Sequence, residues 1–142
     1  MNYKFFDHTA DVLFEVEGKN LDEIFEGAGL ATEETQADLK DVRQKIKKEV
    51  KLENEKIDML LFDFLQELIF LKDAKQLLFS KFDVAIERGG ACDVNLLKAK
   101  MWGEKIDQKR HNLKVDVKAV TLHRFEVKKT KTGWFARVIL DI

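Results

Sequence analysis

Several stretches of the chain alternate apolar and polar residues, which is the spacing of β-strands whose two faces meet different surroundings. The pattern predicts strands near residues 12–17, 42–52, 82–86, 97–101, 113–127 and 134–141. The apolar residues of the 113–127 stretch change phase near Ala119, which predicts a β-bulge there. The last stretch is largely apolar on both faces, so it is predicted to lie in the middle of a sheet.

Other segments repeat apolar residues at three- and four-residue steps, as one face of a helix does. The first helix is predicted to begin after Asn20, whose side chain can cap it together with Glu23, and to end near Thr35. Gly27 and Gly29 weaken this helix and would permit close packing against a neighbour. The second helix is predicted over residues 56–72, and its wide apolar face indicates burial between layers or at an interface.

These elements follow the order β-α-β-α-β-β-β-β. Strands that follow two helices in this way are typical of the α+β class, so we expect two helices packed on a mostly antiparallel sheet. Because 45% of the residues are hydrophobic and 36% are charged, the composition fits a globular protein with a charged surface. We expect one domain over residues 1–142.

The charges nearly cancel, with 25 basic and 26 acidic side chains and a net charge of −1. This balance argues against a stand-alone nucleic-acid-binding protein, so any contact with RNA is expected to be local or to go through a partner. The nearest approach to an anion-binding surface is the basic stripe of the second predicted strand, which includes Arg43, Lys45, Lys47 and Lys51. A solvated edge strand protected by lysine is the favoured interpretation of this stripe.

Composition and motifs also restrict the classes of function. No apolar run is long enough to span a membrane and no secretory signal pattern is present, so we expect a cytoplasmic protein. Cys92 is the only cysteine, which excludes a disulfide within the chain. The sequence has no phosphate-binding glycine loop, HExxH motif, EF-hand loop or nucleophile elbow, and its three histidines are scattered. A catalytic role is therefore poorly supported.

The most informative polar cluster is Asp7-His8-Thr9-Ala10-Asp11. Such residues can bind a cation, accept a proton or hold a turn, and taken alone they favour the turn slightly. The other end of the chain changes that balance, because an apolar strand there leads into Asp141 and the α-carboxylate of Ile142. Held side by side, Asp11, Asp141 and Ile142 would supply oxygen ligands that suit Ca²⁺, Mg²⁺ or Mn²⁺ rather than Zn²⁺.

Five motifs extend this pattern along the chain. They are Asp7-His8-Thr9-Ala10-Asp11, Asp63-Phe64-Leu65-Gln66-Glu67-Leu68, Gly103-Glu104, Val117-Lys118-Ala119-Val120-Thr121-Leu122-His123 and Arg137-Val138-Ile139-Leu140-Asp141-Ile142. In this order, and over nearly the whole chain, they resemble the archease family. The motifs at the two ends and the stretch Lys118-Ala119-Val120-Thr121-Leu122-His123 are the specific ones. Phe64 and Gln66 stand where that family usually has Trp and Asn, and Leu122 stands where it usually has Tyr.

The resemblance implies a protein cofactor of an RNA ligase rather than an enzyme. Its expected partner is the RtcB-type tRNA-splicing ligase, whose guanylylation and multiple turnover it would promote and whose nucleotide use it would broaden. The resemblance also implies that Asp11, Asp141 and Ile142 bind a divalent cation, usually calcium, with magnesium and manganese as alternatives. His8, Glu104 and His123 are candidate supporting residues, and contact with RNA is expected to be indirect.

Other interpretations remain open beside the ligase activator. The resemblance also allows a metal-binding chaperone or specificity modulator of a tRNA cytosine methyltransferase. The acidic residues alone allow a small metal-dependent phosphohydrolase. The apolar second helix allows a structural protein that dimerises through this helix. The ligase activator is the favoured interpretation, and the others follow it in the order given.

Overall fold

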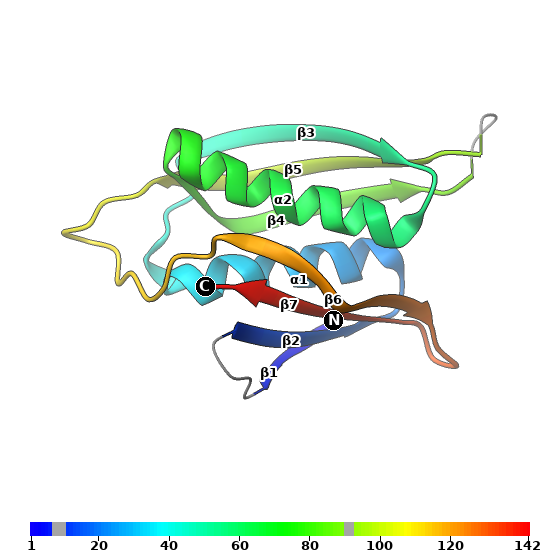
Figure 1. Ribbon diagram of the computed structural model, residues 1–142. Helices are drawn as coiled ribbons and strands as arrows, with labels where there is room; N and C mark the ends of the chain where they lie inside the picture. Colours follow the sequence, from blue (N-terminus) through cyan, green and yellow to red (C-terminus); the bar gives the residue numbers. More distant parts are fainter. Residues whose placement is uncertain (7–10, 90–92) are drawn as a thin grey trace.

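Two antiparallel sheets with two helices between them form the fold of this protein (Figure 1). The computed structural model describes residues 1–6, 11–89 and 93–142. In chain order the elements are β1 (Asn2–Phe6), β2 (Asp11–Gly18), α1 (Leu21–Gln36), the short 3₁₀ helix η1 (Leu39–Asp41), β3 (Ile46–Asn54), α2 (Ile57–Lys75), β4 (Leu77–Glu87), β5 (Asn95–Lys105), β6 (Ala119–Lys129) and β7 (Trp134–Asp141).

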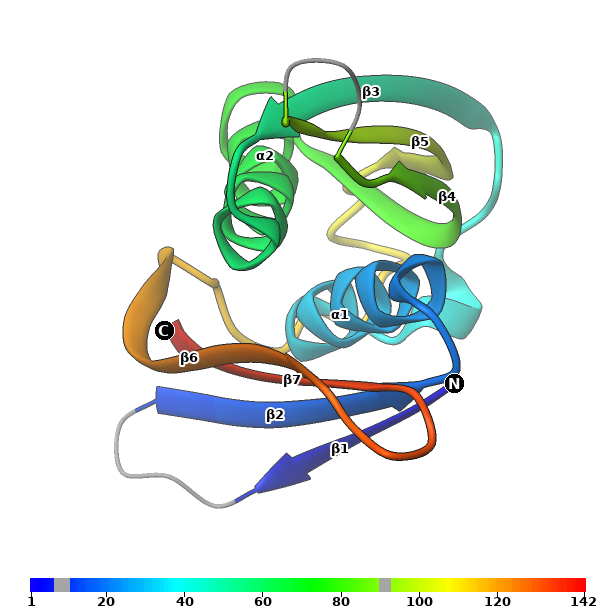
Figure 2. The same ribbon diagram turned by 90° about the vertical axis from the view of Figure 1, so that its right-hand side faces the viewer.

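The larger sheet has the strand order β1-β2-β7-β6 and the smaller sheet has the order β3-β5-β4. Figure 2 shows α1 and α2 in a layer between the small sheet and the large one. Apolar side chains of both helices and both sheets join in one continuous core. In the described ranges, no helix combines the length and the apolar character needed to cross a membrane.

The predicted α+β class, with two helices packed on antiparallel sheets, is confirmed. The structure adds the strand β1 and divides the strands between two sheets. The sequence pattern does not predict β1, because its consecutive aromatic residues Phe5 and Phe6 do not alternate with polar ones. Both side chains are more than two-fifths exposed, at 45% and 43%.

The capping arrangement predicted for α1 is confirmed. The Glu23 amide donates a hydrogen bond of 3.0 Å to the Asn20 side chain, and the Lys19 amide donates one of 3.1 Å to the Glu23 carboxylate. The first bond satisfies a backbone donor in the first turn that has no partner within the helix, and the second holds the chain just before the cap. The sequence signal and the structure agree here because every group involved is local.

The glycines of α1 allow it to lie close to both sheets. A Cβ atom added to Gly27 would lie 2.7 Å from the Val16 side chain on β2. One added to Gly29 would lie 3.1 Å from the Phe82 ring on β4. The close packing predicted from these glycines is confirmed, and it occurs on opposite sides of one helix.

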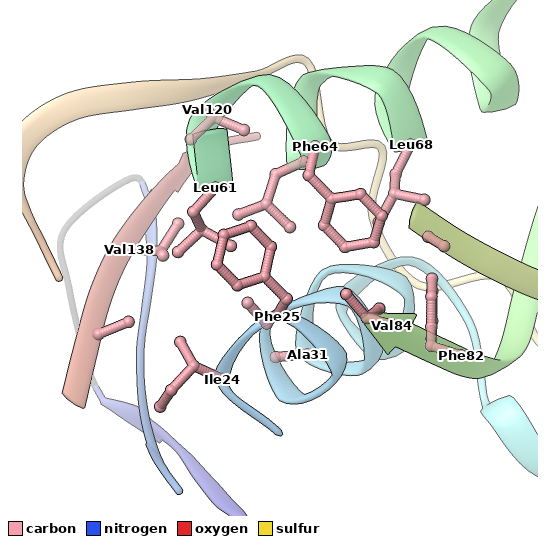
Figure 3. Close-up of a cluster of buried hydrophobic side chains, with 14 of the residues drawn as sticks. Ile24, Phe25, Ala31, Leu61, Phe64, Leu68, Phe82, Val84, Val120 and Val138 are labelled. Carbon is pink, nitrogen blue, oxygen red and sulfur yellow. The ribbon is translucent and has the colours of Figure 1, made fainter. Parts of the chain in front are cut away.

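Three aromatic rings from different elements meet between the sheets (Figure 3). The Phe64 ring of α2 lies 6.0 Å from the ring of Phe25 on α1 and 6.1 Å from the ring of Phe82 on β4. Phe25 and Phe64 are fully buried, and Phe82 is nearly so. The wide apolar face of α2 is therefore buried between layers, which is one of the two outcomes that the sequence predicts.

Strand β7 lies between β2 and β6, so the predicted central position of the last strand is confirmed. Val138, Ile139 and Leu140 are all fully buried. Strand β3 lies at the edge of the small sheet, as its lysine-rich face indicates. A sequence pattern therefore distinguishes a central strand from an edge strand when one is apolar on both faces and the other on only one.

The strand predicted over residues 113–127 is wrong in its first part. β6 begins at Ala119, and the register with β7 is irregular between Thr121 and Glu126 rather than near Ala119. The residues before it are held instead by helix ends, because the Lys114 amide donates to the Gln36 carbonyl and Lys72 Nζ donates to the Val117 carbonyl. Local alternation cannot reveal such distant partners.

Glu33 on α1 is a fully buried acidic residue. Neither carboxylate oxygen accepts a hydrogen bond of normal geometry from the described part of the chain. Burial raises the pKa of the Glu33 carboxyl from 4.5 to about 8, although the Phe79 amide, Lys72 and Gln36 act in the opposite direction. The side chain is therefore largely protonated in the folded protein at neutral pH.

The raised pKa of Glu33 makes the free energy of unfolding fall as the pH rises from about 4.5 to about 8. Because the folded pKa lies above the unfolded one, the stabilisation from Glu33 is complete below about pH 4.5 and is lost as the pH rises to about 8. We predict that Glu33→Gln removes this loss, which amounts to about 1 kcal/mol per pH unit. Urea unfolding across this range measures the effect. Glu17→Gln, at an exposed position, should keep the wild-type slope, and a wild-type free energy that is flat over this range would contradict the prediction.

Candidate metal-binding site

The structure brings Asp11 and Asp141 together. Asp11 is the first residue of β2 and Asp141 the last of β7, and the two are direct partners in the antiparallel register. Ala119 of β6 is the partner of Asp141 on its other side. Directly opposite residues on neighbouring strands point to the same face of a sheet, so the two carboxylates share one face.

The electrostatics of this pair favour a cation. Like charges directly opposite each other on neighbouring strands are destabilising, by up to about 1 kcal/mol. Asp141 is exposed and Asp11 is partly exposed, so water screens the repulsion. The Lys118 amide fixes the main chain beside them by donating a hydrogen bond of 2.8 Å to the Asp141 carbonyl.

Ile142 anchors the end of the chain next to this pair. Its side chain packs against the main core. It also lines an open pocket of about 630 Å³ together with Asp11, Glu34 and Lys114. Figure 1 shows the end of β7 beside the start of β2. Ile142 therefore directly follows Asp141 and lies beside the acidic pair.

The donor set fits a hard divalent cation. The side chains of Asp11 and Asp141 are carboxylates, which suit Ca²⁺, Mg²⁺ or Mn²⁺ better than Zn²⁺. Across residues 1–6, 11–89 and 93–142, no group of three or more His, Cys, Asp or Glu side chains is placed to hold a metal ion. Side chains of the described residues would therefore supply two ligands, and main-chain oxygens, water or a partner would supply the others.

The candidate supporting residues lie in different places. His8, with Asp7 and Thr9, lies outside the described residues. His123 is exposed and lies in the irregular part of β6 between Thr121 and Glu126. Glu104 lies in β5, in the small sheet, whereas Asp11 and Asp141 belong to the large one.

Glu104 is held by several groups from distant parts of the chain. Its carboxylate lies 2.5 Å from an Arg110 guanidinium nitrogen and 2.9 Å from the His111 Nε2, and the Arg43 amide donates to it at 2.6 Å. Burial opposes its ionisation most strongly, but Arg110, the Arg43 amide and His111 together hold the pKa of Glu104 down, at about 2. In this structure Glu104 joins two connecting segments to the sheet.

Sequence reasoning singled out His111 together with Glu104 and Asp107, but it missed Arg43 and Arg110 as partners of Glu104, and it also missed Lys114. Arg110 and His111 lie in a polar connection that gives no periodic signal, and Arg43 is 61 residues from Glu104 in the chain. Lys114 donates to the Glu34 carbonyl at 3.1 Å and lines the pocket beside Asp11. No pattern in the sequence predicts any of these contacts.

We predict that Glu104→Gln lowers the free energy of unfolding at pH 7 by about 2 kcal/mol, because it weakens hydrogen bonds between charged groups. The folded pKa of Glu104 is depressed, so its stabilisation is complete above about pH 4.5 and is lost as the pH falls toward about 2. The gap between wild type and variant should therefore close in acid. Denaturant titrations at neutral and acidic pH measure it, with the exposed Glu53→Gln as control. An equal loss at both pH values would contradict the electrostatic explanation.

Comparison with known proteins gives a consistent result along the whole chain. A family model described as the archease protein family matches residues 3–142. The archease of Pyrococcus abyssi is 36% identical over 141 residues, which cover 99% of this chain and 98% of that protein. The archease of Archaeoglobus fulgidus is 36% identical over 142 residues and is covered completely, as is this chain.

Solved structures agree with the fold. The solution structure of Methanobacterium thermoautotrophicum protein 1598 has a TM-score of 0.86 and 38% identity, covering 99% of this chain and 98% of that one. An archease from Thermotoga maritima, described as a possible chaperone, has a TM-score of 0.62 at 21% identity over 98% of this chain and 96% of that one, so it supports the fold alone. From the family model and the full-length relatives, this chain belongs to the archease family.

Proposed function

We propose that this protein is an accessory factor that activates an RtcB-type tRNA-splicing RNA ligase. In this role it promotes guanylylation of the ligase, allows multiple turnover and broadens the use of nucleotides. Membership of the archease family supports the general role. The observation that carries the proposal is the direct pairing of Asp11 with Asp141 at the exposed end of a central strand.

Asp11, Asp141 and the α-carboxylate of Ile142 would hold a divalent cation, with calcium as the first candidate and magnesium or manganese as alternatives. When bound, the cation supplies positive charge that neutralises phosphate oxygens during nucleotidyl transfer. The protein's own residues set where that charge is presented. The Asp11 and Asp141 carboxylates project from paired strands rather than from a loop, so their positions are fixed by the register of β2 with β7.

The surroundings of the acidic pair suit a protein partner. Phe5 and Phe6 are exposed and line the pocket next to Asp11, and Val115 is 41% exposed in the same pocket. Exposed apolar side chains around a charged group are common in surfaces that bind other proteins. A partner that covers them would exclude water from the acidic pair and strengthen its electrostatic effect.

A second candidate function is a chaperone or specificity modulator of a tRNA cytosine methyltransferase. The family resemblance allows this role, and the Thermotoga maritima archease is itself described as a possible chaperone. In this role the cation would stabilise the fold or the interface. Pull-down of the ligase and of the methyltransferase with this protein separates the candidates, because the first requires a complex with the ligase.

Removal of divalent cations should expose the repulsion between the acidic residues. We predict that calcium raises the unfolding temperature of the wild type, because a ligand that binds the folded state stabilises it by mass action. Asp141→Asn should abolish most of this rise. In the presence of a chelator the variant should be more stable than the wild type, by up to about 1 kcal/mol. Thermal unfolding with calcium and with chelator measures both effects, and an identical calcium response in both proteins would exclude Asp141 as a ligand.

The proposed activity can be tested by multiple-turnover RNA ligation with the cognate ligase and GTP. We predict that the wild type stimulates ligation and that Asp141→Ala loses at least about tenfold of this stimulation, because a charged ligand is missing. Glu17→Ala is the matched control, since Glu17 is an exposed carboxylate at the other end of β2. Circular dichroism establishes that each variant is folded. Stimulation by folded Asp141→Ala at the wild-type level would refute the role of the acidic pair.

A further inference from the structure

An open hollow of about 880 Å³ lies where the small sheet meets the β5–β6 connection. Its lining includes five cations, Arg43, Lys45, Lys105, Lys109 and Arg110, and two carboxylates, Glu104 and Asp107. Arg110 is paired with Glu104 at 2.5 Å and reaches Asp107 at 3.9 Å. The hollow therefore has an excess of three positive charges, whereas the whole chain has a net charge of −1.

The other cations of this hollow are available to a ligand. Arg43, Lys45, Lys105 and Lys109 are exposed, and their side chains form no ion pair within the part of the chain that the structure describes. The Glu104 cluster fixes the segments that bear two of them, because it joins the Arg43 amide and Arg110 to β5. A fixed group of unpaired cations attracts a polyanion and releases its counterions.

An aromatic residue adjoins the hollow. Trp102 lies two residues before Glu104 in β5, and its strand partners are Lys47 on β3 and Lys81 on β4. All three side chains point to the outer face of the small sheet, since partners in register share a face. Trp102 is partly exposed, and the Lys81 ammonium lies 4.8 Å from the centre of its ring. A nucleic-acid base can take the place of that ammonium over the ring and leave Lys81 for a phosphate.

Both features lie at the end of the molecule that bears the acidic pair. Figure 1 shows β3 beginning and β5 ending at the end where β7 stops and β2 starts. A polymer bound along the hollow would therefore lie at the end of the protein that the proposed function assigns to the ligase. The choice of RNA among polyanions rests on that proposed function.

We propose that Arg43, Lys45, Lys105 and Lys109, with Trp102 beside them, form a basic surface that binds a single-stranded segment of RNA. The cations contact phosphates and Trp102 stacks on a base. Cation contacts alone would also suit an acidic peptide, but a peptide of Glu and Asp has no ring to stack on Trp102. Double-stranded RNA keeps its bases stacked inside the helix, so it would use only the cations. The contact is local, as the near-neutral charge of the chain requires.

The direct test is fluorescence anisotropy of a labelled single-stranded RNA of about ten nucleotides with the full chain. Binding should weaken with salt, with a slope of about −0.7 per phosphate contact. Lys45→Gln/Lys109→Gln should bind several-fold more weakly and reduce the slope by about 1.4. The matched control is Lys129→Gln/Lys131→Gln, which removes the same charge from the β6–β7 hairpin at the other end of the molecule and should behave as wild type. An equal loss in the control would overturn the proposal.

A second measurement tests the stacking of a base on Trp102 without mutating this residue. Trp102 and Trp134 are the two tryptophans of the chain, so Trp134→Phe leaves Trp102 as the fluorophore. RNA should quench its emission, whereas polyglutamate of equal length should neither quench it nor displace the RNA efficiently. Unquenched Trp102, or polyglutamate that competes as well as RNA, would overturn the proposal even if salt-dependent binding occurs.

The failure of this inference can be distinguished from that of the proposed function. Asp141→Ala should bind RNA as the wild type does, because Asp141 lies outside the basic surface. Ligase stimulation by a protein that does not bind RNA at about 50 mM salt would overturn only the RNA contact. RNA binding by a protein that does not stimulate the ligase would overturn only the ligase role.

Discussion

The antiparallel pairing of β2 with β7 is the interaction on which the rest of the structure depends. It joins residues 11–18 to residues 134–141, so it closes a loop of nearly the whole chain, and burial must offset the entropy lost in this closure. The offset comes from side chains such as Phe14 and Val138, which are fully buried against the helices. A shift of register by one residue would turn these side chains to the other face. The apolar pattern of both strands therefore fixes the register, and the register sets Asp11 opposite Asp141.

No additional structural element is needed to hold the carboxylates of Asp11 and Asp141 in place. The carboxylates stand at the ends of strands whose remaining residues bury the core, so the energy that folds the large sheet also positions them. The same register opposes two negative charges, which is unfavourable for folding alone. Local conflicts of this kind are expected where a sequence serves function rather than stability. A bound cation would turn the conflict into a favourable interaction, which is the physical reason to connect this pair with metal rather than with packing.

The parts of the fold that the sequence predicts are those determined by neighbours along the chain. The Asn20 cap, the buried face of α2 and the central position of β7 all follow from local spacing. The pairing of Asp11 with Asp141 could be suspected because one short apolar strand begins at a carboxylate and another ends at one. The path of residues 113–118 and the setting of Glu104 depend on partners such as Gln36, Lys72 and Arg43, which are far away in sequence. Alternating apolar residues predict a strand there, but Leu113 and Val115 are exposed, and hydrogen bonds to the helices decide the conformation.

Net charge is also a poor guide to local charge in this chain. Its 25 basic and 26 acidic side chains nearly cancel, yet the acidic pair and the basic surface lie at one end of the molecule. At physiological salt, exposed charges interact over only about 8 to 10 Å. Each charged group therefore affects a ligand directly beside it, and the net charge of the chain matters little. An enzyme that joins RNA ends must bring together phosphates, which cations hold, and metal ions, which carboxylates hold. In the proposed role, an accessory protein with both kinds of group at one end would meet both needs, whereas either group alone would leave the phosphate or the metal to the partner.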